Sequence, residues 1–382
     1  MRNLRGVVLA TLIGSGLSGL AAGTASASPY LQTNLVSDIP LPGALLDTNL
    51  KNPWGMSFSA TGPFWISDQG TGLSTLYSVT AAGVSKVGLE VTIPTTVGGP
   101  QGPTGQVNNN TAAFLVNGVK SNFIFANLNG TISAWNGSAM TTAVVKVTPT
   151  AAAPAVYTGV ALGDPSTPRL YAANGATGKI DVFGGDFMPV TTLGPTAFVN
   201  TDPRLAGLAP FNVKNIGGNI YVTYAPPGRA AQIAAGEGVG AVAIFDRDGN
   251  LIKTLVAGSL LASPWGITLA PSTFGGFGGA LLVGNFSFAV SEINAFDPIT
   301  GAYLGTIGGQ DGKRFINSGL WALEFGIGGN NGNPRTLYFT AGINGERDGL
   351  FGSIAAIPEP ASLALLGLGL AGLALSRRRK FG

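Results

Sequence analysis

Short apolar segments separated by glycine, proline, asparagine and aspartate recur along almost the whole chain, and the clearest group lies between Ser263 and Gly309. Within this group apolar and small residues alternate in four segments, Trp265–Ala270, Ala280–Gly284, Ser291–Phe296 and Ala302–Ile307. Such alternation between turn residues is typical of short antiparallel strands. The segment Asp297–Gly301 contains proline and glycine, which favour a tight hairpin. The pattern predicts a four-stranded sheet, and a lone sheet of this size needs neighbouring copies to bury both faces.

This four-stranded unit is repeated along the chain. Asn52-Pro53-Trp54-Gly55 matches Ser263-Pro264-Trp265-Gly266, and six anchor residues stand at the same place in successive copies: Gly55, Gly105, Gly159, Asn212, Gly266 and Ala322. Their spacing is 50 to 56 residues, close to the period of about 40–50 residues that propeller blades show. We predict an all-β, six-bladed β-propeller with blades at about 52–94, 102–149, 155–194, 208–258, 263–309 and 318–357. The alternative is a β-sandwich with accidental spacing.

The last blade contains only three recognisable strands, Trp321–Phe325, Thr336–Thr340 and Leu350–Ala355. A closed propeller must join its two ends, because otherwise two sheet edges stay open. We expect Leu31–Ile39, which precedes the first blade, to supply the missing strand and close the ring. The alternative is that this segment is a disordered leader.

The fourth blade carries an insertion between Tyr224 and Gly240 that is longer than the equivalent segment elsewhere. Long loops in compact domains are often functional, so this one is a candidate lid or binding loop. It contains Arg229 and Glu237, which could contact a ligand. The alternatives are a tolerated surface insertion and two solvated charges.

The chain contains no cysteine and no histidine. This composition excludes disulfides, thiolate metal sites and a Ser-His-Asp triad. The formal charge of +3 comes from the two ends, because residues 28–357 hold 15 basic and 17 acidic residues. The body of the chain therefore lacks the electrostatic footprint of a nucleic-acid-binding protein.

The first 27 residues have the order of a secretory signal peptide. Arg2 and Arg5 precede the apolar segment Gly6–Ala22, and Ala25-Ser26-Ala27 offers small side chains to signal peptidase. We expect cleavage to leave a propeller domain over residues 28–357. The alternative is an uncleaved anchor helix.

The C-terminal residues 358–382 have three parts: Pro358-Glu359-Pro360, the apolar run Ala361–Leu375, and Arg377-Arg378-Arg379-Lys380. This order resembles the PEP-CTERM sorting signal of Gram-negative bacteria. The resemblance implies a short transmembrane helix, recognition by an exosortase, removal of the tail, and release or attachment at the cell surface, commonly in species that produce exopolysaccharide. The alternative is a simple C-terminal anchor.

The body of the chain resembles NHL-type six-bladed propellers through Ile66-Ser67-Asp68 followed by Gly72–Tyr77. It more closely resembles a family of exported bacterial propellers through Asn34-Leu35-Val36-Ser37-Asp38, Asn52-Pro53-Trp54-Gly55, Phe339-Thr340-Ala341-Gly342 and Asp348-Gly349-Leu350-Phe351-Gly352. This resemblance covers nearly all of residues 30–357. It implies the fold and carries no activity.

The second strands tend to end in an aspartate or asparagine, at Asp68, Asn127, Asn174 and Asn285. On one face of a propeller these oxygens could ring the channel and bind Ca²⁺, which prefers oxygen ligands. The alternative is that they cap strand ends, since Asx residues favour turns. The loop Asp246–Asn250 faintly resembles a calcium loop, but it stands where the fifth blade has its hairpin.

Three tryptophans, Trp54, Trp265 and Trp321, recur at the starts of inner strands and could stack on sugar rings together with Arg229. The alternative is that they pack between blades. We interpret the chain as a secreted, non-enzymatic propeller that binds an exopolysaccharide or a surface protein. The competing hypothesis is a Ca²⁺-dependent hydrolase or lactonase on the same fold.

Overall fold

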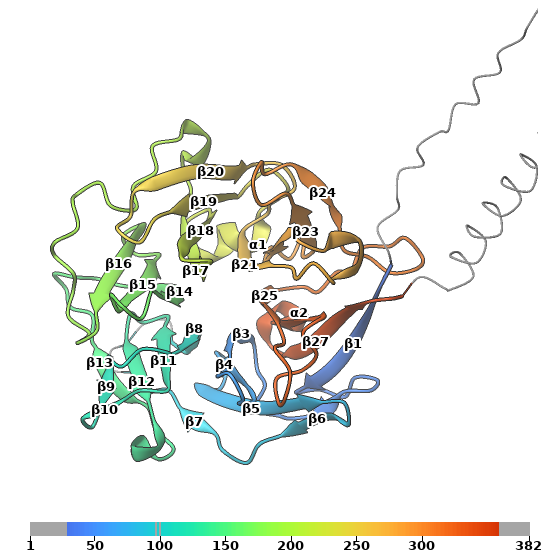
Figure 1. The fold of residues 1–382 in the computed structure, drawn as a ribbon, viewed down its shortest axis with the longest axis horizontal. Coiled ribbons are helices and arrows are strands. Elements are labelled where there is room, and N and C mark those ends of the chain that lie inside the picture. Colours follow the sequence, from blue (N-terminus) through green and yellow to red (C-terminus); the bar gives the residue numbers. More distant parts are fainter. Residues whose placement is uncertain (1–28, 96–97, 99–100, 359–382) are drawn as a thin grey trace, which may run out of the picture.

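The computed structural model describes residues 29–95, 98 and 101–358, and over this part of the chain six sheets surround a central channel (Figure 1). In the first five blades the main strands pair antiparallel and follow one another outward from the channel in chain order, whereas the outer strand of the sixth blade comes from residues 30–37. The prediction of an all-β, six-bladed propeller is confirmed.

The first three blades follow the expected order. The first contains β3 (Pro53–Ser57), β4 (Phe64–Asp68), β5 (Leu73–Thr80) and β6 (Gly83–Lys86), with β7 (Val91–Thr92) beside β5. The second contains β8 (Pro103–Asn108), β11 (Phe123–Asn127), β12 (Ile132–Trp135) and β13 (Val144–Val147), and carries a small hairpin of β9 (Leu115–Val116) and β10 (Val119–Lys120). The third contains β14 (Tyr157–Leu162), β15 (Arg169–Asn174) and β16 (Lys179–Gly184).

The last three blades carry both α-helices of the described chain. The fourth contains β17 (Ala209–Ile216), β18 (Asn219–Ala225), β19 (Ala241–Phe245) and β20 (Leu251–Ala257), with α1 (Arg229–Ala234) in its long loop. The fifth contains β21 (Pro264–Leu269), β22 (Leu281–Asn285), β23 (Ile293–Phe296) and β24 (Tyr303–Thr306). The sixth contains β25 (Leu320–Phe325), β26 (Thr336–Ala341) and β27 (Leu350–Ala356), with α2 (Ile343–Glu346) after β26. Three 3₁₀ turns lie at Gly137–Ala139, Pro203–Leu205 and Gly275–Phe277.

The outer edge of the sixth blade is formed by the N-terminal strand β1 (Tyr30–Ser37), which pairs antiparallel with β27 from Tyr30 opposite Ala356 to Ser37 opposite Leu350. A two-residue strand β2 (Leu45–Leu46) adds to β1 in parallel. The Tyr30 hydroxyl donates to the Phe274 carbonyl oxygen at 3.0 Å and its ring stacks on Phe277. The first strand of the described chain is therefore tied to the fifth blade as well as to the sixth.

The third blade differs from the expectation of four strands in every unit, because its sheet has three strands within the described chain. The segment after β16 contains Pro189, Pro195 and Pro203, and proline cannot donate to a strand ladder. Phe187 and Phe198 in the same segment have φ angles of 66° and 59°, outside the β region. These residues bury their rings at the outer edge of the blade in place of a fourth strand.

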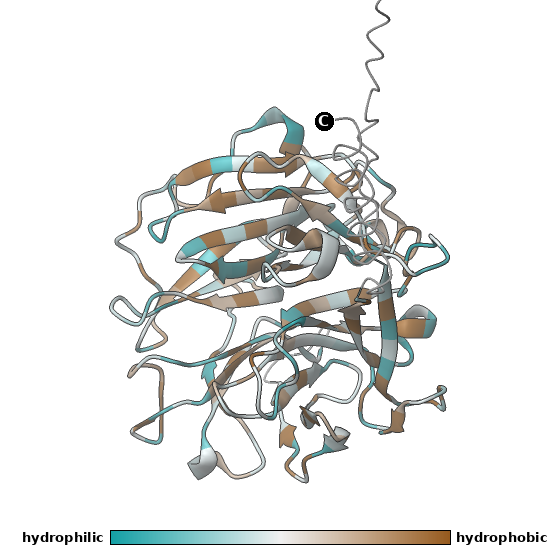
Figure 2. Ribbon diagram, turned by 45° about the vertical axis from the view of Figure 1, so that its right-hand side comes forward, coloured by the Kyte–Doolittle hydropathy of each residue, from teal (hydrophilic) through white to brown (hydrophobic). Residues whose placement is uncertain are grey.

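The core lies between neighbouring blades, so the second strand of a blade is covered on both faces. All residues of β4, β11 and β22 are buried. The alternating hydropathy along the strands is visible in Figure 2. Each inner strand contacts the inner strand of the next blade, and β25 contacts β3, which closes the ring.

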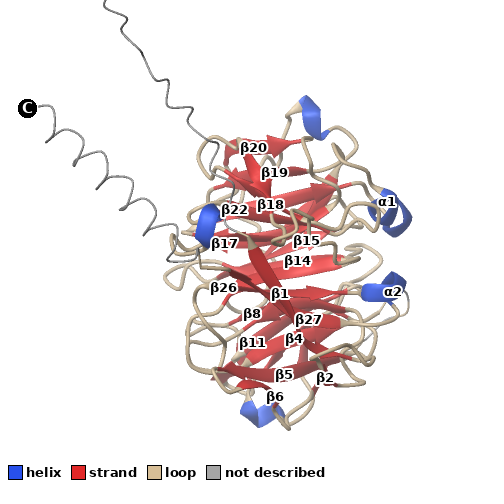
Figure 3. Cartoon of the chain, turned by 90° about the vertical axis from the view of Figure 1, so that its right-hand side faces the viewer, coloured by secondary structure: helices blue, strands red, loops and turns tan. Residues whose placement is uncertain are grey.

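The two faces of the propeller differ. The helices α1 and α2 both lie on one face, seen edge-on in Figure 3. Because α1 and α2 follow second strands, this helical face is also where the inner strands begin. The inner strands end on the opposite face, which we call the open face.

Several sequence expectations concern residues that the structure does not describe. These are the signal peptide 1–27, the apolar run 361–375, and the sorting residues Glu359, Pro360, Arg377, Arg378 and Arg379. Pro358 is described and exposed. No helix among the described residues is long and apolar enough to cross a membrane.

Candidate functional site in the channel

The glycine anchors lie where neighbouring inner strands meet, and we call this level of the channel the waist. A Cβ added to Gly55 would lie 2.5 Å from the Thr104 carbonyl oxygen, and one added to Gly105 would lie 2.6 Å from the Val160 nitrogen. The inner strands therefore touch backbone to backbone at this waist, where a side chain on these glycines would collide. This contact explains why glycine or alanine stands at five of the six anchors.

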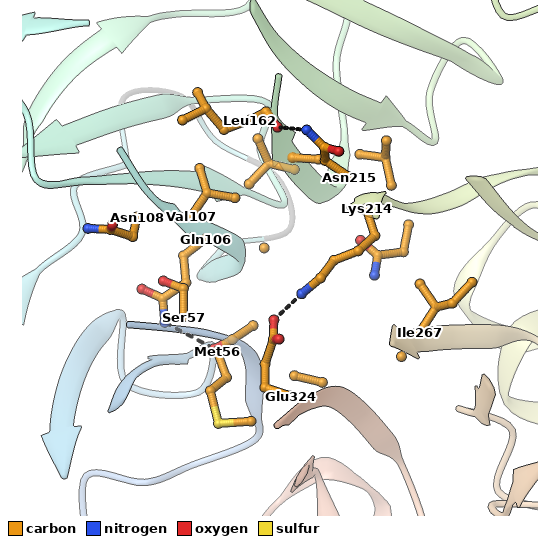
Figure 4. Close-up of a pocket in the computed structure, with 18 of the residues that line it drawn as sticks. Met56, Ser57, Gln106, Val107, Asn108, Leu162, Lys214, Asn215, Ile267 and Glu324 are labelled. Carbon is orange, nitrogen blue, oxygen red and sulfur yellow. Dashed lines mark hydrogen bonds and ion pairs between the residues drawn. The ribbon is translucent and has the colours of Figure 1, made fainter. Parts of the chain in front are cut away.

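A cavity of about 310 Å³ lies between the waist and the open face, and all six inner strands line it (Figure 4). Its apolar wall includes Met56, Val107 and Ile267. Its polar groups come from at least four blades: Ser57, Gln106, Asn108, Asn110, Asn212, Lys214, Asn215 and Glu324. A concave site with a few convergent polar groups is the usual form of a small-molecule site.

Lys214 of β17 and Glu324 of β25 form an ion pair in this cavity, although their strands belong to blades four and six. Their side chains are 30% and 17% exposed, respectively. Among the described residues they are the only charged groups in the lining. The cavity is therefore close to neutral while holding strong donors and acceptors that remain within reach of solvent.

Four amide side chains in the lining donate to backbone carbonyl oxygens and are thereby oriented: Gln106, Asn108, Asn212 and Asn215. Gln106 Nε2 donates to the carbonyl oxygens of Gly55 at 3.1 Å and Trp65 at 2.5 Å, whereas Gln106 Oε1 is buried without a partner among the described residues. Asn215 Nδ2 donates to the Leu162 carbonyl oxygen at 3.0 Å. Such positioning reduces the ordering that ligand binding would otherwise require.

The channel is closed at the helical face by packed aromatic side chains. Trp54 and Trp321 stack with ring centroids 3.6 Å apart, and Phe286 stacks on Trp321 at 4.1 Å. Trp265 packs edge-on against both tryptophans. Trp54, Trp265 and Trp321 are 1%, 4% and 0% exposed, respectively. The structure thus brings the three expected tryptophans together, but as a closed cluster rather than an open stacking platform for sugars.

Arg229 of α1 covers this aromatic cluster. Its guanidinium carbon lies 4.0 Å from the Phe286 ring centroid, 4.8 Å from that of Trp321 and 5.1 Å from that of Trp54. Glu346 of α2 pairs with it. Burial lowers the pKa of Arg229 below its ordinary value, and the carboxylate of Glu346 opposes that shift. The blade-four insertion therefore acts as a cover over this end of the channel.

Asp68, Asn127, Asn174 and Asn285 occupy equivalent positions, each paired with the first residue of its inner strand. All four are buried. Asn174 Oδ1 accepts from the Val156 amide at 3.1 Å, and Asn285 Oδ1 accepts from the Ala262 amide at 2.9 Å. Each of these bonds fixes the segment that leads into the inner strand of its own blade, as expected for a cap.

Asp68 is the one carboxylate in this series. Its Oδ2 accepts from the Thr75 hydroxyl at 2.7 Å and the Thr75 amide at 3.2 Å, while Oδ1 is buried with no partner in the described chain. Burial raises the pKa of Asp68 well above its usual range, against the effect of the Thr75 hydrogen bonds. Within residues 29–95, 98 and 101–358, no three or more His, Cys, Asp or Glu residues are grouped to hold a metal ion. Calcium binding therefore stays a prediction.

Lys214, Glu324 and Gln106 line the cavity but were not among the site residues expected from the sequence. A signal was present, because Lys214 and Glu324 each stand two residues after an anchor, at Asn212 and Ala322. Side chains two positions apart on a strand share a face.

The turn over Asp246–Asn250, which was compared with a calcium loop, is held by its own hydrogen bonds. Asp246 accepts from the Asp248 and Asn250 amides.

Comparisons with known proteins agree with this architecture. Residues 356–380 match the PEP-CTERM protein-sorting motif, which implies export and sorting by an exosortase. The structure resembles the soluble aldose sugar dehydrogenase of Escherichia coli, with a TM-score of 0.51 and 11% identity over 86% of this chain and 100% of that chain. At that identity the likeness shows the fold alone.

The protein is thus a six-bladed β-propeller with a PEP-CTERM sorting motif. It is 30% identical over 329 residues to uncharacterized protein R648 of Acanthamoeba polyphaga mimivirus, covering 84% of this chain and 78% of that one. The chain belongs to the family of that protein. It is also 30% identical over 226 residues to uncharacterized protein R640 of the same virus, covering 59% of this chain and 41% of that one. A bacterial, NHL-like family of exported propellers stays a prediction.

Proposed function

We propose that this protein is an exosortase-sorted, cell-surface propeller that binds the end of an exopolysaccharide in the cavity at the open face, without catalysing a reaction. The observation that carries the proposal is the neutral Lys214–Glu324 pair inside a cavity of convergent polar groups. Lys214 Nζ has three N–H donors and Glu324 has two acceptor oxygens. Neighbouring hydroxyls of a sugar can accept from one and donate to the other while the ion pair persists.

Amide groups in the same cavity suit a neutral sugar. Asn108, Asn110 and Asn215 line the cavity, and their amide groups can both donate to and accept from sugar hydroxyls. A charged ligand would pair with either Lys214 or Glu324 and leave the other side chain without its partner. Breaking an ion pair in this way is unfavourable when the remaining charge is partly buried. We favour this cavity over the three tryptophans as the sugar site, because Trp54, Trp265 and Trp321 are buried and Arg229 lies over their cluster.

Calorimetric titration of the purified protein with surface-polysaccharide fragments tests this function. Fragments that bind the native protein should bind Lys214→Met about tenfold more weakly, as expected for the loss of a hydrogen bond to a charged group. Lys253→Met serves as a matched control, since Lys253 lies on the outer strand β20 and contacts the Ile299 carbonyl oxygen. Equal binding by the native protein and both variants would place the ligand elsewhere.

We also propose that signal peptidase and an exosortase process the protein, and that the mature chain spans residues 28–357. Arg377→Ala, Arg378→Ala and Arg379→Ala together should impair tail processing, because cations next to an apolar run fix its orientation. The measurement is the mass and location of the protein in a Gram-negative host with and without an exosortase. Normal maturation of the triple variant would contradict the role of these arginines.

The competing function, a Ca²⁺-dependent hydrolase or lactonase, is favoured by one observation, the buried Oδ1 of Asp68, which has no partner in the described part of the chain. A resident calcium ion would bind that oxygen and would raise the thermal stability of the protein. Thermal unfolding with Ca²⁺ and with a chelator, together with an assay on lactones, tests this function. An unchanged melting temperature and no turnover would rule it out.

A further inference from the structure

The aromatic cluster at the helical face has the composition of a cation site. Phe286, Trp321 and Trp54 surround the Arg229 guanidinium at 4.0, 4.8 and 5.1 Å from its central carbon, respectively. The rings come from blades five, six and one, while Arg229 comes from the insertion in blade four. An aromatic face attracts a cation placed over it. The rings and their cationic occupant therefore belong to separate elements of the fold.

The segment from Gly228 to Gly238, which we call the strap, carries Arg229 and is attached to the fold mainly behind its helix. The helix α1 contains no buried residue, and its N-cap Gly228 makes no side-chain capping bond. Gly228 and Gly238 flank the strap with φ angles of 87° and 90°, so both ends have glycine freedom. Behind the helix, the Ile233 carbonyl oxygen accepts from the Ser287 hydroxyl and the Phe288 amide, each at 3.1 Å, and the Ser287 hydroxyl also donates to the Ala235 carbonyl oxygen.

The closed arrangement has identifiable costs. Glu346, the carboxylate paired with Arg229, has a φ of 66°, and Asn344 in the same turn has a φ of 53°. Left-handed backbone is unfavourable at a residue that has a Cβ. Trp54 Nε1 and Arg229 Nη1 are buried without a partner among the described residues. The Arg229 side chain is nevertheless 34% exposed, so the edge of the site reaches solvent.

We propose that this cluster is a binding site for small organic cations, such as a quaternary ammonium or a guanidinium group, in which Arg229 is the resident occupant. An incoming cation takes the place of the Arg229 guanidinium over Phe286, Trp321 and Trp54. Glu346 serves as its counterion. To admit the cation, the strap moves away from the rings by rotation at Gly228 and Gly238. This cation site is separate from the sugar site proposed at the open face.

The test compares the native protein with Arg229→Ala, using choline and methylguanidinium as probes. Binding is read from tryptophan fluorescence and thermal shift. The neutral isostere of choline, 3,3-dimethylbutan-1-ol, controls for simple apolar filling, and Arg335→Ala, an exposed arginine elsewhere, controls for loss of charge. Both cations should bind the native protein weakly and Arg229→Ala about tenfold or more tightly, because no internal cation then competes. The neutral alcohol should bind neither.

Three results would overturn the proposal. If the Arg229→Ala variant folds but binds no cation, the aromatic rings have only a structural role at this end of the channel. Equal binding of choline and its neutral isostere would show an apolar cavity rather than a cation site. Binding to Arg229→Ala with none to the native protein at any concentration would show that the strap never opens. If Arg229→Ala fails to fold, Arg229→Lys keeps the charge with a shorter reach and should still bind choline more tightly than the native protein.

Discussion

Lys214 and Glu324 pair across the channel although an entire blade separates their strands around the ring. The geometry of the ring, rather than local sequence, brings the two side chains together. Both remain partly accessible, and among described groups each has the other as its charged partner. The ion pair therefore depends on the closure of the ring, and it supplies the charged groups of the cavity.

We predict that Lys214→Met and Glu324→Gln each lower the free energy of unfolding by about 1 kcal/mol or less, because partly exposed ion pairs contribute little to stability. Ligand binding in the cavity should fall much more than stability does. The charge-exchanged double variant Lys214→Glu/Glu324→Lys should recover most of the stability. Urea unfolding and calorimetric titration measure the two effects. A loss of several kcal/mol in either single variant would show a structural rather than a recognition role.

The waist of the channel gives a second prediction. Gly105→Ala should lower the free energy of unfolding by about 1–3 kcal/mol, the usual range for overpacking, because the new Cβ meets the backbone of the next blade at 2.6 Å. Gly88→Ala is the matched control, since nothing lies within 4 Å of its added Cβ. Chemical unfolding of the two variants provides the comparison. If both behave like the native protein, the inner strands are less tightly packed than the structure indicates.

The repeat could be read from the sequence because the anchor residues are the places where neighbouring blades touch. The strand limits were also close, as Trp265–Ala270 was expected and β21 spans Pro264–Leu269. The site was harder to find. The residues around Trp54 do not indicate that its ring is covered by Arg229 instead of being exposed to solvent. Arg229 belongs to an insertion 175 residues further along the chain. Lys214 and Glu324 likewise meet only through the closure of the ring.

The N-terminal strand gives a third prediction. Deleting residues 28–40 removes β1 and leaves the edge of β27 unpaired, and such edges promote aggregation. The deletion also removes the Tyr30 hydroxyl, which donates to the Phe274 carbonyl oxygen and accepts from the Phe277 amide. We expect a lower melting temperature and concentration-dependent aggregation. Leu31→Ala, at an exposed position of the same strand, should change neither. An unchanged melting temperature in the deleted protein would contradict a closing role for this strand.

The last prediction concerns Asp68, the carboxylate at a position where blades two, three and five have asparagine. Its folded-state pKa is raised by burial. Stability from this group is therefore fully present below the ordinary carboxyl pKa of about 4 and is lost as the pH rises toward the raised value. Asp68→Asn keeps an acceptor for Thr75 and carries no charge. The variant should be more stable than the native protein at pH 7, because it has no ionisable group whose charged form is disfavoured by burial.

The difference in stability between Asp68→Asn and the native protein should shrink as the pH falls from 7 toward 4, because the native carboxyl is then protonated in both the folded and the unfolded states. Urea unfolding of the two proteins at several pH values measures this difference, and groups common to both cancel. Thr75→Val is a useful second variant, since it removes the hydroxyl that donates to Asp68 and should be less stable than the native protein. A different pattern would identify a metal site: calcium would stabilise the native protein, and Asp68→Asn would lose that response and be the less stable of the two at pH 7.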